Sequence, residues 1–156
     1  MMFSTKAEYG VRVMAHLAGR SDGDGPVSLH AIAEAEGLPQ AYLEHLAARL
    51  RKSGLVESHR GARGGYTLAR PAGQITMAEV VRALEGDIAP IECITSDADG
   101  ALTCVREGEP SHQPCPTKLL WTRVQGSIVR TLTDMTLADL ARPAPVSLDN
   151  RTEVTA

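Results

Sequence analysis

Residues 28–68 read SLHAIAEAEGLPQAYLEHLAARLRKSGLVESHRGARGGYTL, and this stretch predicts two helices followed by a tight hairpin. Ser28 is suited to cap the first helix, whose apolar face carries Ile32 and Ala33. Gly37 can adopt the left-handed conformation that ends a helix. A short turn is therefore expected to separate the two helices.

The second predicted helix begins after Pro39, which can start a helix but cannot continue one. Its apolar positions recur at the spacing i, i+3, i+4 and i+7, which places one stripe along the helix: Leu43, Leu46, Ala47 and Leu50. Gly54 is expected to end this helix.

Two short strands are predicted next, at residues 55–58 and 66–69, joined by a connection with three glycines and two arginines. Val27 is expected to add a small strand beside this hairpin. Two helices and a basic hairpin form a winged helix-turn-helix, whose second helix enters a DNA major groove. The alternative is a module used only for protein contacts, with Arg60 and Arg63 as solvated turn residues.

Positive charge is concentrated in this region, although the whole chain carries a net charge of −3. Residues 49–70 contain one acidic side chain, Glu57, against six basic ones: Arg49, Arg51, Lys52, Arg60, Arg63 and Arg70. A local basic patch on a mildly acidic protein favours a specific, dimeric DNA-binding regulator over a general nucleic-acid coat.

The length of 156 residues fits one domain with an appended element. The sequence has no apolar run of membrane-spanning length and no signal-peptide core, so we expect a cytoplasmic protein. Scarce aromatic residues argue against a single-strand binder that stacks bases. We find no phosphate-binding loop, nucleophile elbow or catalytic carboxylate pair in the sequence, so we do not expect an enzyme.

Two further helices flank the predicted module. The sequences TKAE at residues 5–8 and TMAE at residues 76–79 both have the spacing of a capping box at a helix start. The first of these helices is expected to end at Gly19 and the second at Gly86.

Residues 87–114 show no helical or strand period and are interrupted by prolines and glycines. Acidic residues dominate here, and a loop of this length is usually functional or disordered. Cys93, Cys104 and Cys115 lie in this segment or at its end, eleven residues apart.

Pro116 is suited to the first turn of a long helix with an apolar seam at Leu120, Val124, Ile128 (or Val129) and Leu132. Because the core is already complete, we expect this helix to form a dimer interface; folding back onto its own core is the alternative. A last short helix is predicted to begin near Thr136.

The fold is thus predicted to be mainly α with one small β-hairpin. Residues 1–86 would form the DNA-binding domain, 87–142 the cysteine-bearing loop and dimerisation helix, and 143–156 a disordered tail.

Three thiols in one acidic segment form a metal-site constellation, although no CxxC pair is present. An iron–sulfur cluster takes Cys thiolates as ligands, whereas a zinc site would use them together with His112. A thiol redox switch would need no metal. The fourth alternative is that the three cysteines are unrelated and simply pack as small apolar residues.

The chain resembles the IscR/NsrR/RirA family of bacterial regulators over about residues 1–142. The resemblance rests on Tyr9 and the segments YLE (42–44), LRKSGLV (50–56), RG (60–61), GGY (64–66) and LLW (119–121). It implies a homodimeric winged-helix repressor or activator whose long helix dimerises. It also implies an iron–sulfur cluster on Cys93, Cys104 and Cys115, which we expect to be of the 2Fe–2S rather than the 4Fe–4S type.

The fourth ligand is where this chain departs from the family pattern. Its cysteines lie farther apart than in the commonest members, and Lys118 stands where the IscR-like branch has a histidine. In the NsrR-like branch an acidic side chain from the partner subunit's first helix completes the site, and Glu8 stands at that position. Capping its own helix is the competing role for Glu8, and His112 is the other candidate ligand.

We expect a labile cluster to link the loop of one subunit to the first helix of the other, so that its loss shifts the recognition helices and changes DNA affinity. The signal would be iron, cluster supply, nitric oxide or redox state. A zinc- or thiol-based regulator on the same scaffold is the alternative.

The expected target is a pseudo-palindromic double-stranded operator. The start of the second helix would meet base edges or phosphates, and Arg60 and Arg63 would enter the minor groove. The predicted DNA-binding residues are Ser28, Gln40, Tyr42, Glu44, Arg49, Arg51, Lys52, Arg60, Gly61 and Arg63.

Overall fold

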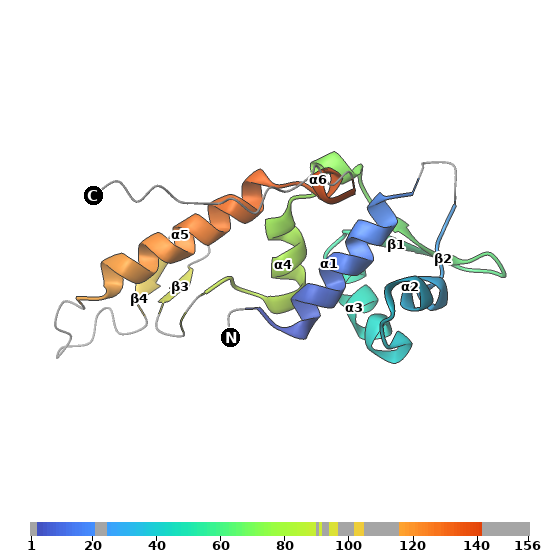
Figure 1. Cartoon of the computed structure of the whole chain (residues 1–156), viewed down its shortest axis with the longest axis horizontal. Helices are drawn as coiled ribbons and strands as arrows, with labels where there is room; N and C mark the ends of the chain where they lie inside the picture. Colours follow the sequence, from blue (N-terminus) through green and yellow to red (C-terminus); the bar gives the residue numbers. More distant parts are fainter. Residues whose placement is uncertain are drawn as a thin grey trace.

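The computed structural model describes residues 3–20, 25–89, 91, 94–96, 102–104 and 116–141. Figure 1 shows a helical body with a hairpin projecting from one end and a long helix extending from the other. In chain order the elements are α1 (Thr5–Ala18), α2 (Leu29–Glu36), α3 (Gln40–Lys52), β1 (Val56–His59), β2 (Gly65–Leu68), η1 (Ala72–Gln74), α4 (Met77–Glu85), β3 (Ile94–Ser96), β4 (Leu102–Cys104), α5 (Lys118–Asp134) and α6 (Leu137–Ala141).

The predicted winged helix-turn-helix is confirmed. The Ser28 hydroxyl accepts a hydrogen bond from the Ala31 N–H at 3.1 Å and so caps α2. Gly37 ends α2 with φ of 64°, in the left-handed region. The predicted apolar stripe of α3 is buried, from Leu43 to Leu50. Its burial fixes which face of α3 remains exposed.

The wing is an antiparallel pair in which Val56 lies opposite Leu68 and His59 opposite Gly65. Each strand is thus displaced by one residue from its predicted bounds. The predicted strand at Val27 is confirmed as a bridge to Tyr66, with N–H···O distances of 3.0 and 2.8 Å. A Cβ at Gly65 would stand 2.3 Å from the Val27 carbonyl oxygen, so only glycine fits this approach.

The body of the fold depends on close packing between α1 and α4. A Cβ at Gly10 would lie 2.2 Å from Leu84 Cδ1, so the missing side chain makes room for Leu84. Leu84 is completely buried in a core that joins all the helices of the body. The largest buried side chains include Met14, Ile32, Leu43, Leu50 and Leu137.

One of the two predicted capping boxes is confirmed and the other is wrong. At α4 the Thr76 hydroxyl accepts from the Glu79 N–H, and the Glu79 carboxylate accepts from the Thr76 N–H. At α1 the N-cap is Ser4, one residue earlier than predicted, and its hydroxyl accepts from the Lys6 N–H. Glu8 therefore takes no part in capping α1.

A distant carboxylate replaces Glu8 in that role. Glu85, the last residue of α4, accepts hydrogen bonds from the Ser4 N–H at 2.9 Å, the Ser4 hydroxyl and the Ala7 N–H at 3.3 Å. Lys6 Nζ lies 3.5 Å from the same carboxylate. The Glu85 carboxylate at the end of α4 thus accepts hydrogen bonds from the free N–H groups of α1 and places a negative charge at the positive end of its dipole.

The segment 87–114, predicted to lack regular structure, contains a small hairpin. Strands β3 and β4 pair antiparallel, with Ile94 opposite Cys104 and Ser96 opposite Leu102. Three residues per strand are too few to produce a recognisable period in the sequence. The hairpin places Cys104 on a defined strand, whereas Cys93 lies outside the described residues.

The long helix α5 begins at Lys118, two residues after the predicted start, because Pro116 and Thr117 form a turn. Its C-terminal part packs against the body, where Leu132 contacts the core. Near its start, Leu119 and Leu120 are 64% and 55% exposed. The helix thus folds back at one end and presents apolar side chains at the other.

The predicted short helix after α5 is confirmed as α6. It is attached by backbone bonds from the Met77 N–H to the Met135 carbonyl (2.9 Å) and from the Leu137 N–H to the Ile75 carbonyl (2.8 Å). The predicted disordered tail, residues 143–156, lies outside the described residues.

We predict that Glu85→Gln destabilises the fold. Burial alone would raise the pKa of Glu85, but hydrogen bonds from Ser4 and the charge of Lys6 hold this pKa below its ordinary value of 4.5. Because folding lowers the pKa, the carboxylate stabilises the fold fully above about pH 4.5, and this contribution is lost as pH falls through the lower folded-state pKa. Urea unfolding at pH 7 and fixed protein concentration should show a loss of about 1–2 kcal/mol.

The matched control is Glu34→Gln, because Glu34 is exposed on α2 and makes no hydrogen bond or ion pair among the described residues. The free energies of unfolding of native and Glu85→Gln protein should converge once the pH has fallen below the lowered folded-state pKa of Glu85. An equal loss for both variants, or a Glu85→Gln effect that does not depend on pH, would contradict this assignment.

Candidate nucleic-acid interface and ligand residues

The N-terminal end of α3 presents polar side chains to solvent. Gln40 and Glu44 are exposed, and Gln40 Oε1 lies 3.2 Å from His30 Nδ1 on α2. Tyr42 is half-buried and packs edge-to-face on Tyr9, with ring centroids 5.8 Å apart. This contact joins the recognition helix to α1 and fixes the Tyr42 ring.

The C-terminal end of α3 carries the basic residues of the predicted patch. Arg51 Nη1 lies 3.4 Å from Ser58 Oγ on β1, while Lys52 is exposed. Arg49 turns toward the body, where its Nη1 donates to the Leu84 carbonyl at 3.2 Å. Arg49 thus connects the recognition helix to the end of α4.

The tip of the wing is formed by exposed residues 60–63, with Arg60 and Arg63 on either side of the turn. Gly61 has φ of 115°, a conformation that side chains rarely adopt, and its carbonyl accepts from the Gly64 N–H at 2.9 Å. His59 Nε2 lies 2.9 Å from Thr67 Oγ1 across the two strands. Figure 1 shows this tip projecting beyond the helices.

Sequence reasoning missed a charged cluster that fixes α2 against α1. Glu36, at the end of α2, pairs with Arg12 at 3.2 Å and with His16 Nδ1 at 3.0 Å. Arg12 also donates to the Glu36 backbone carbonyl. Arg12 and His16 are four residues apart and so share one helix face, but this spacing alone does not identify Glu36 as their partner.

Two of the five predicted metal ligands belong to the described residues. Cys104 is buried in β4, and Glu8 is exposed on α1. Cys93, Cys115 and His112 lie outside the described residues. Within the described part of the chain, no three His, Cys, Asp or Glu side chains come together as a metal site.

Glu8 lies at the edge of a largely apolar hollow of about 540 Å³. The hollow is also lined by Phe3 and Val11 of the N-terminal region, Val81 of α4 and Leu132 of α5. Within the described residues, Glu8 makes no hydrogen bond or ion pair. Its carboxylate is therefore available for a contact from outside the chain.

In the described ranges, no helix is both long enough and apolar enough to cross a membrane.

The family model described as "Rrf2: Iron-dependent Transcriptional regulator" matches residues 3–143. The regulator CymR of Bacillus subtilis is 38% identical over 141 residues, which cover 90% of each chain. IscR of Xenorhabdus nematophila is 37% identical over 142 residues, covering 91% of this chain and 80% of that protein.

Solved structures agree with these relatives. The structure of CymR (YrzC), the global cysteine regulator of B. subtilis, has a TM-score of 0.72 and 37% identity, covering 90% of this chain and 96% of that one. IscR of T. potens has a TM-score of 0.70 and 41% identity, covering 90% and 85%. These relatives are transcriptional regulators and not enzymes, and the chain belongs to the Rrf2 family of transcriptional regulators.

Proposed function

We propose that this Rrf2-family regulator acts in the cytoplasm as a homodimer that binds a pseudo-palindromic operator. The observation that carries the proposal is the pairing of an exposed α3 N-terminus with an exposed, arginine-bearing wing. Burial of the α3 stripe leaves the opposite face free to enter a major groove. A two-fold dimer would present two such units to the two halves of an operator.

Within this proposal, we assign a role to each predicted DNA-binding residue. Gln40 and Glu44 would meet base edges, and the edge-to-face contact with Tyr9 would hold Tyr42 ready for a base or phosphate. Arg51, Lys52 and the α2 N-terminus at Ser28 would contact phosphates. Gly61 shapes the wing turn, and Arg49 has one N–H engaged by Leu84.

We predict that Arg60→Ala weakens operator binding by about 1–3 kcal/mol, because a minor-groove or phosphate contact is lost. The measurement is a fluorescence-anisotropy titration on a site found by footprinting of genomic DNA. The salt dependence should also become less steep, by about one unit of slope.

Arg82→Ala is the matched control, since Arg82 is exposed on α4, away from the wing. It should leave both affinity and salt slope unchanged. If an Arg60→Ala, Arg63→Ala double variant binds the operator with native affinity, the wing does not contribute to DNA binding.

We further propose that Cys93, Cys104 and Cys115 hold an iron–sulfur cluster, preferably of the 2Fe–2S type, with Glu8 of the partner subunit as the fourth ligand. Three thiols suit such a cluster chemically. The finding that Ser4 and Glu85 cap α1 supports a ligand role for Glu8, since capping does not engage its carboxylate. His112 would complete the donor set if Glu8 does not. A cluster with one oxygen ligand would be labile and so able to report iron, nitric oxide or redox state.

The end of α4 offers a route from the cysteine segment to DNA. Leu84 accepts from Arg49 of the recognition helix, and Glu85 caps α1 on the same turn. Residue 87, where the cysteine-bearing segment begins, follows directly. A change in that segment would therefore act on α1 and α3 together, as a two-state element biased by its ligand.

A regulator that responds through thiols or zinc is the second candidate. The three cysteines are compatible with it, and so is the similarity to CymR, described as a global cysteine regulator. A further similar structure, 35% identical with a TM-score of 0.70, is the oxidised form of CymR from Staphylococcus aureus and covers 94% of this chain and all of that one.

We predict that anaerobically purified protein is coloured and contains iron and acid-labile sulfide, as measured by visible absorption and chemical analysis. Glu8→Ala should retain the three thiolates but lose its colour in air about tenfold faster, because one ligand is missing. Glu34→Ala, which alters a carboxylate on α2, should behave like the native protein.

A colourless protein with stoichiometric zinc would favour the zinc-based alternative. A colourless, metal-free protein that forms a disulfide on oxidation would favour the thiol-based one. Either result would overturn the cluster proposal while leaving operator binding intact.

A further inference from the structure

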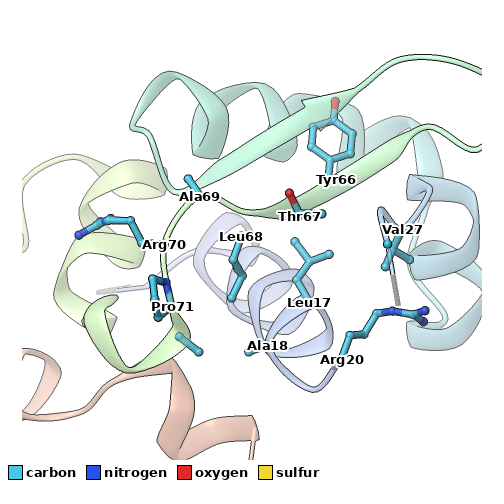
Figure 2. A pocket seen from close by; sticks show the side chains of 12 residues that line it. Leu17, Ala18, Arg20, Val27, Tyr66, Thr67, Leu68, Ala69, Arg70 and Pro71 are labelled. Carbon is cyan, nitrogen blue, oxygen red and sulfur yellow. The ribbon is translucent and has the colours of Figure 1, made fainter. Parts of the chain in front are cut away.

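A second hollow, of about 420 Å³, lies between the end of α1, strand β2 and η1. Figure 2 shows Leu17 and Leu68 at its centre, with Arg20 and Arg70 extending outward from its two sides. Its lining mixes apolar side chains with polar groups, and no acidic residue lines it among the described residues. Neither operator binding nor the cysteine segment uses this cavity.

The cavity contains a free stretch of sheet edge. Tyr66 exchanges both backbone hydrogen bonds with Val27, so its N–H and carbonyl point away from β1. Ala69 donates to Leu55 on the β1 side. Since backbone groups alternate along a strand, those of Leu68 point the same way as those of Tyr66. Among the described residues, nothing pairs with them.

The local sequence explains why this edge stays open. Continuing the antiparallel pairing from Val27 and Tyr66 would bring Gly25 opposite Leu68. Gly25 has φ of 70°, outside the extended region, so the chain turns away after one bridge. An unpaired N–H and carbonyl in a partly apolar cavity cost free energy, and a third strand would satisfy them.

The chain itself carries a segment suited to this edge. Residues 145–150 read PVSLDN, in which apolar Val146 and Leu148 alternate with Ser147 and Asp149. Alternation of this kind between a proline and an asparagine is typical of a short, half-buried strand. The segment lies beyond residue 143, where the match to the family model ends.

The attachment of α6 brings this segment within reach. Helix α6 packs against both α1 and η1, the two elements that line the cavity together with β2. Backbone bonds at Ile75 and Met77 hold it there. From Ala141, residues 142–145 can span about 13 Å when extended.

We propose that residues 146–149 add to the free edge of β2 as a further strand, with Val146 and Leu148 in the cavity. Asp149 then lies near an arginine whichever direction the strand takes, because Arg20 and Arg70 stand on opposite sides. Arg70 also pairs with Glu79 at 2.9 Å. Docking would tie the C-terminal segment to the root of the wing. The proposal is independent of the cluster and of the operator.

The test is amide hydrogen exchange by NMR on the full chain and a full-length Val146→Asp, Leu148→Asp variant. Leu68 should be protected in the native chain and exchange about tenfold faster or more in the variant. The Tyr66 amide, bonded to Val27, is the internal control for an intact wing and should not change. The methyl resonances of Leu17 and Val27 should shift in the same variant.

A Thr152→Asp, Val154→Asp variant is the matched control, because it adds the same charge outside the proposed strand. It should leave Leu68 exchange at the native rate. An unprotected Leu68 amide in the native chain would overturn the proposal. Equal protection in native and Val146→Asp, Leu148→Asp protein would also overturn it, since another group would then cover the edge.

Discussion

The carboxylate of Glu85 joins the end of α4 to the beginning of α1. It accepts three hydrogen bonds from Ser4 and Ala7 and lies near Lys6. One residue earlier, Leu84 fills the space above Gly10 and its carbonyl accepts from Arg49. A single turn of α4 therefore holds α1, α3 and α4 together, in addition to the direct contact of Tyr9 on α1 with Tyr42 on α3.

This junction also has a position that suits regulation. The cysteine-bearing segment continues directly from it, and Glu8 lies one turn along α1 from the capped end. A ligand bound by both the cysteine-bearing segment and Glu8 would therefore act on both sides of the contact between the end of α4 and the start of α1. Because packed helices adopt discrete arrangements rather than deforming continuously, a small change there can move α3 as a unit.

Local signals in the sequence predicted much of the fold correctly. Helices α2, α3 and α4 have a clear apolar face together with an end signal, such as Ser28, Gly37 or the TMAE box. The errors arose where a distant residue decides the local structure. Thr5 and Glu8 matched a capping box, but Glu85 satisfies the N-terminus of α1 from 81 residues away in sequence. Strands β3 and β4 were too short to predict.

The site was predicted less completely than the fold. The positions of Gln40, Glu44 and Arg60 on exposed surfaces follow from the helical stripe and the glycine-rich turn. Contacts between elements did not follow from the sequence, because spacing along one element cannot specify a partner on another. Examples are the bond from Arg49 to Leu84 and the pairing of Glu36 with Arg12 and His16. The DNA-contact and ligand roles themselves remain predictions.

We propose that a cofactor on the three cysteines sets the affinity of α3 and the wing for DNA. The most direct test of this proposal is operator affinity, measured anaerobically with iron and sulfide supplied or chelated, for native protein and a variant with Cys93, Cys104 and Cys115 all changed to Ser. We expect the affinity of the native protein to differ between the two conditions by about tenfold or more, whereas the variant should show one affinity throughout. Equal affinities for native protein in both conditions, matching the variant, would contradict it.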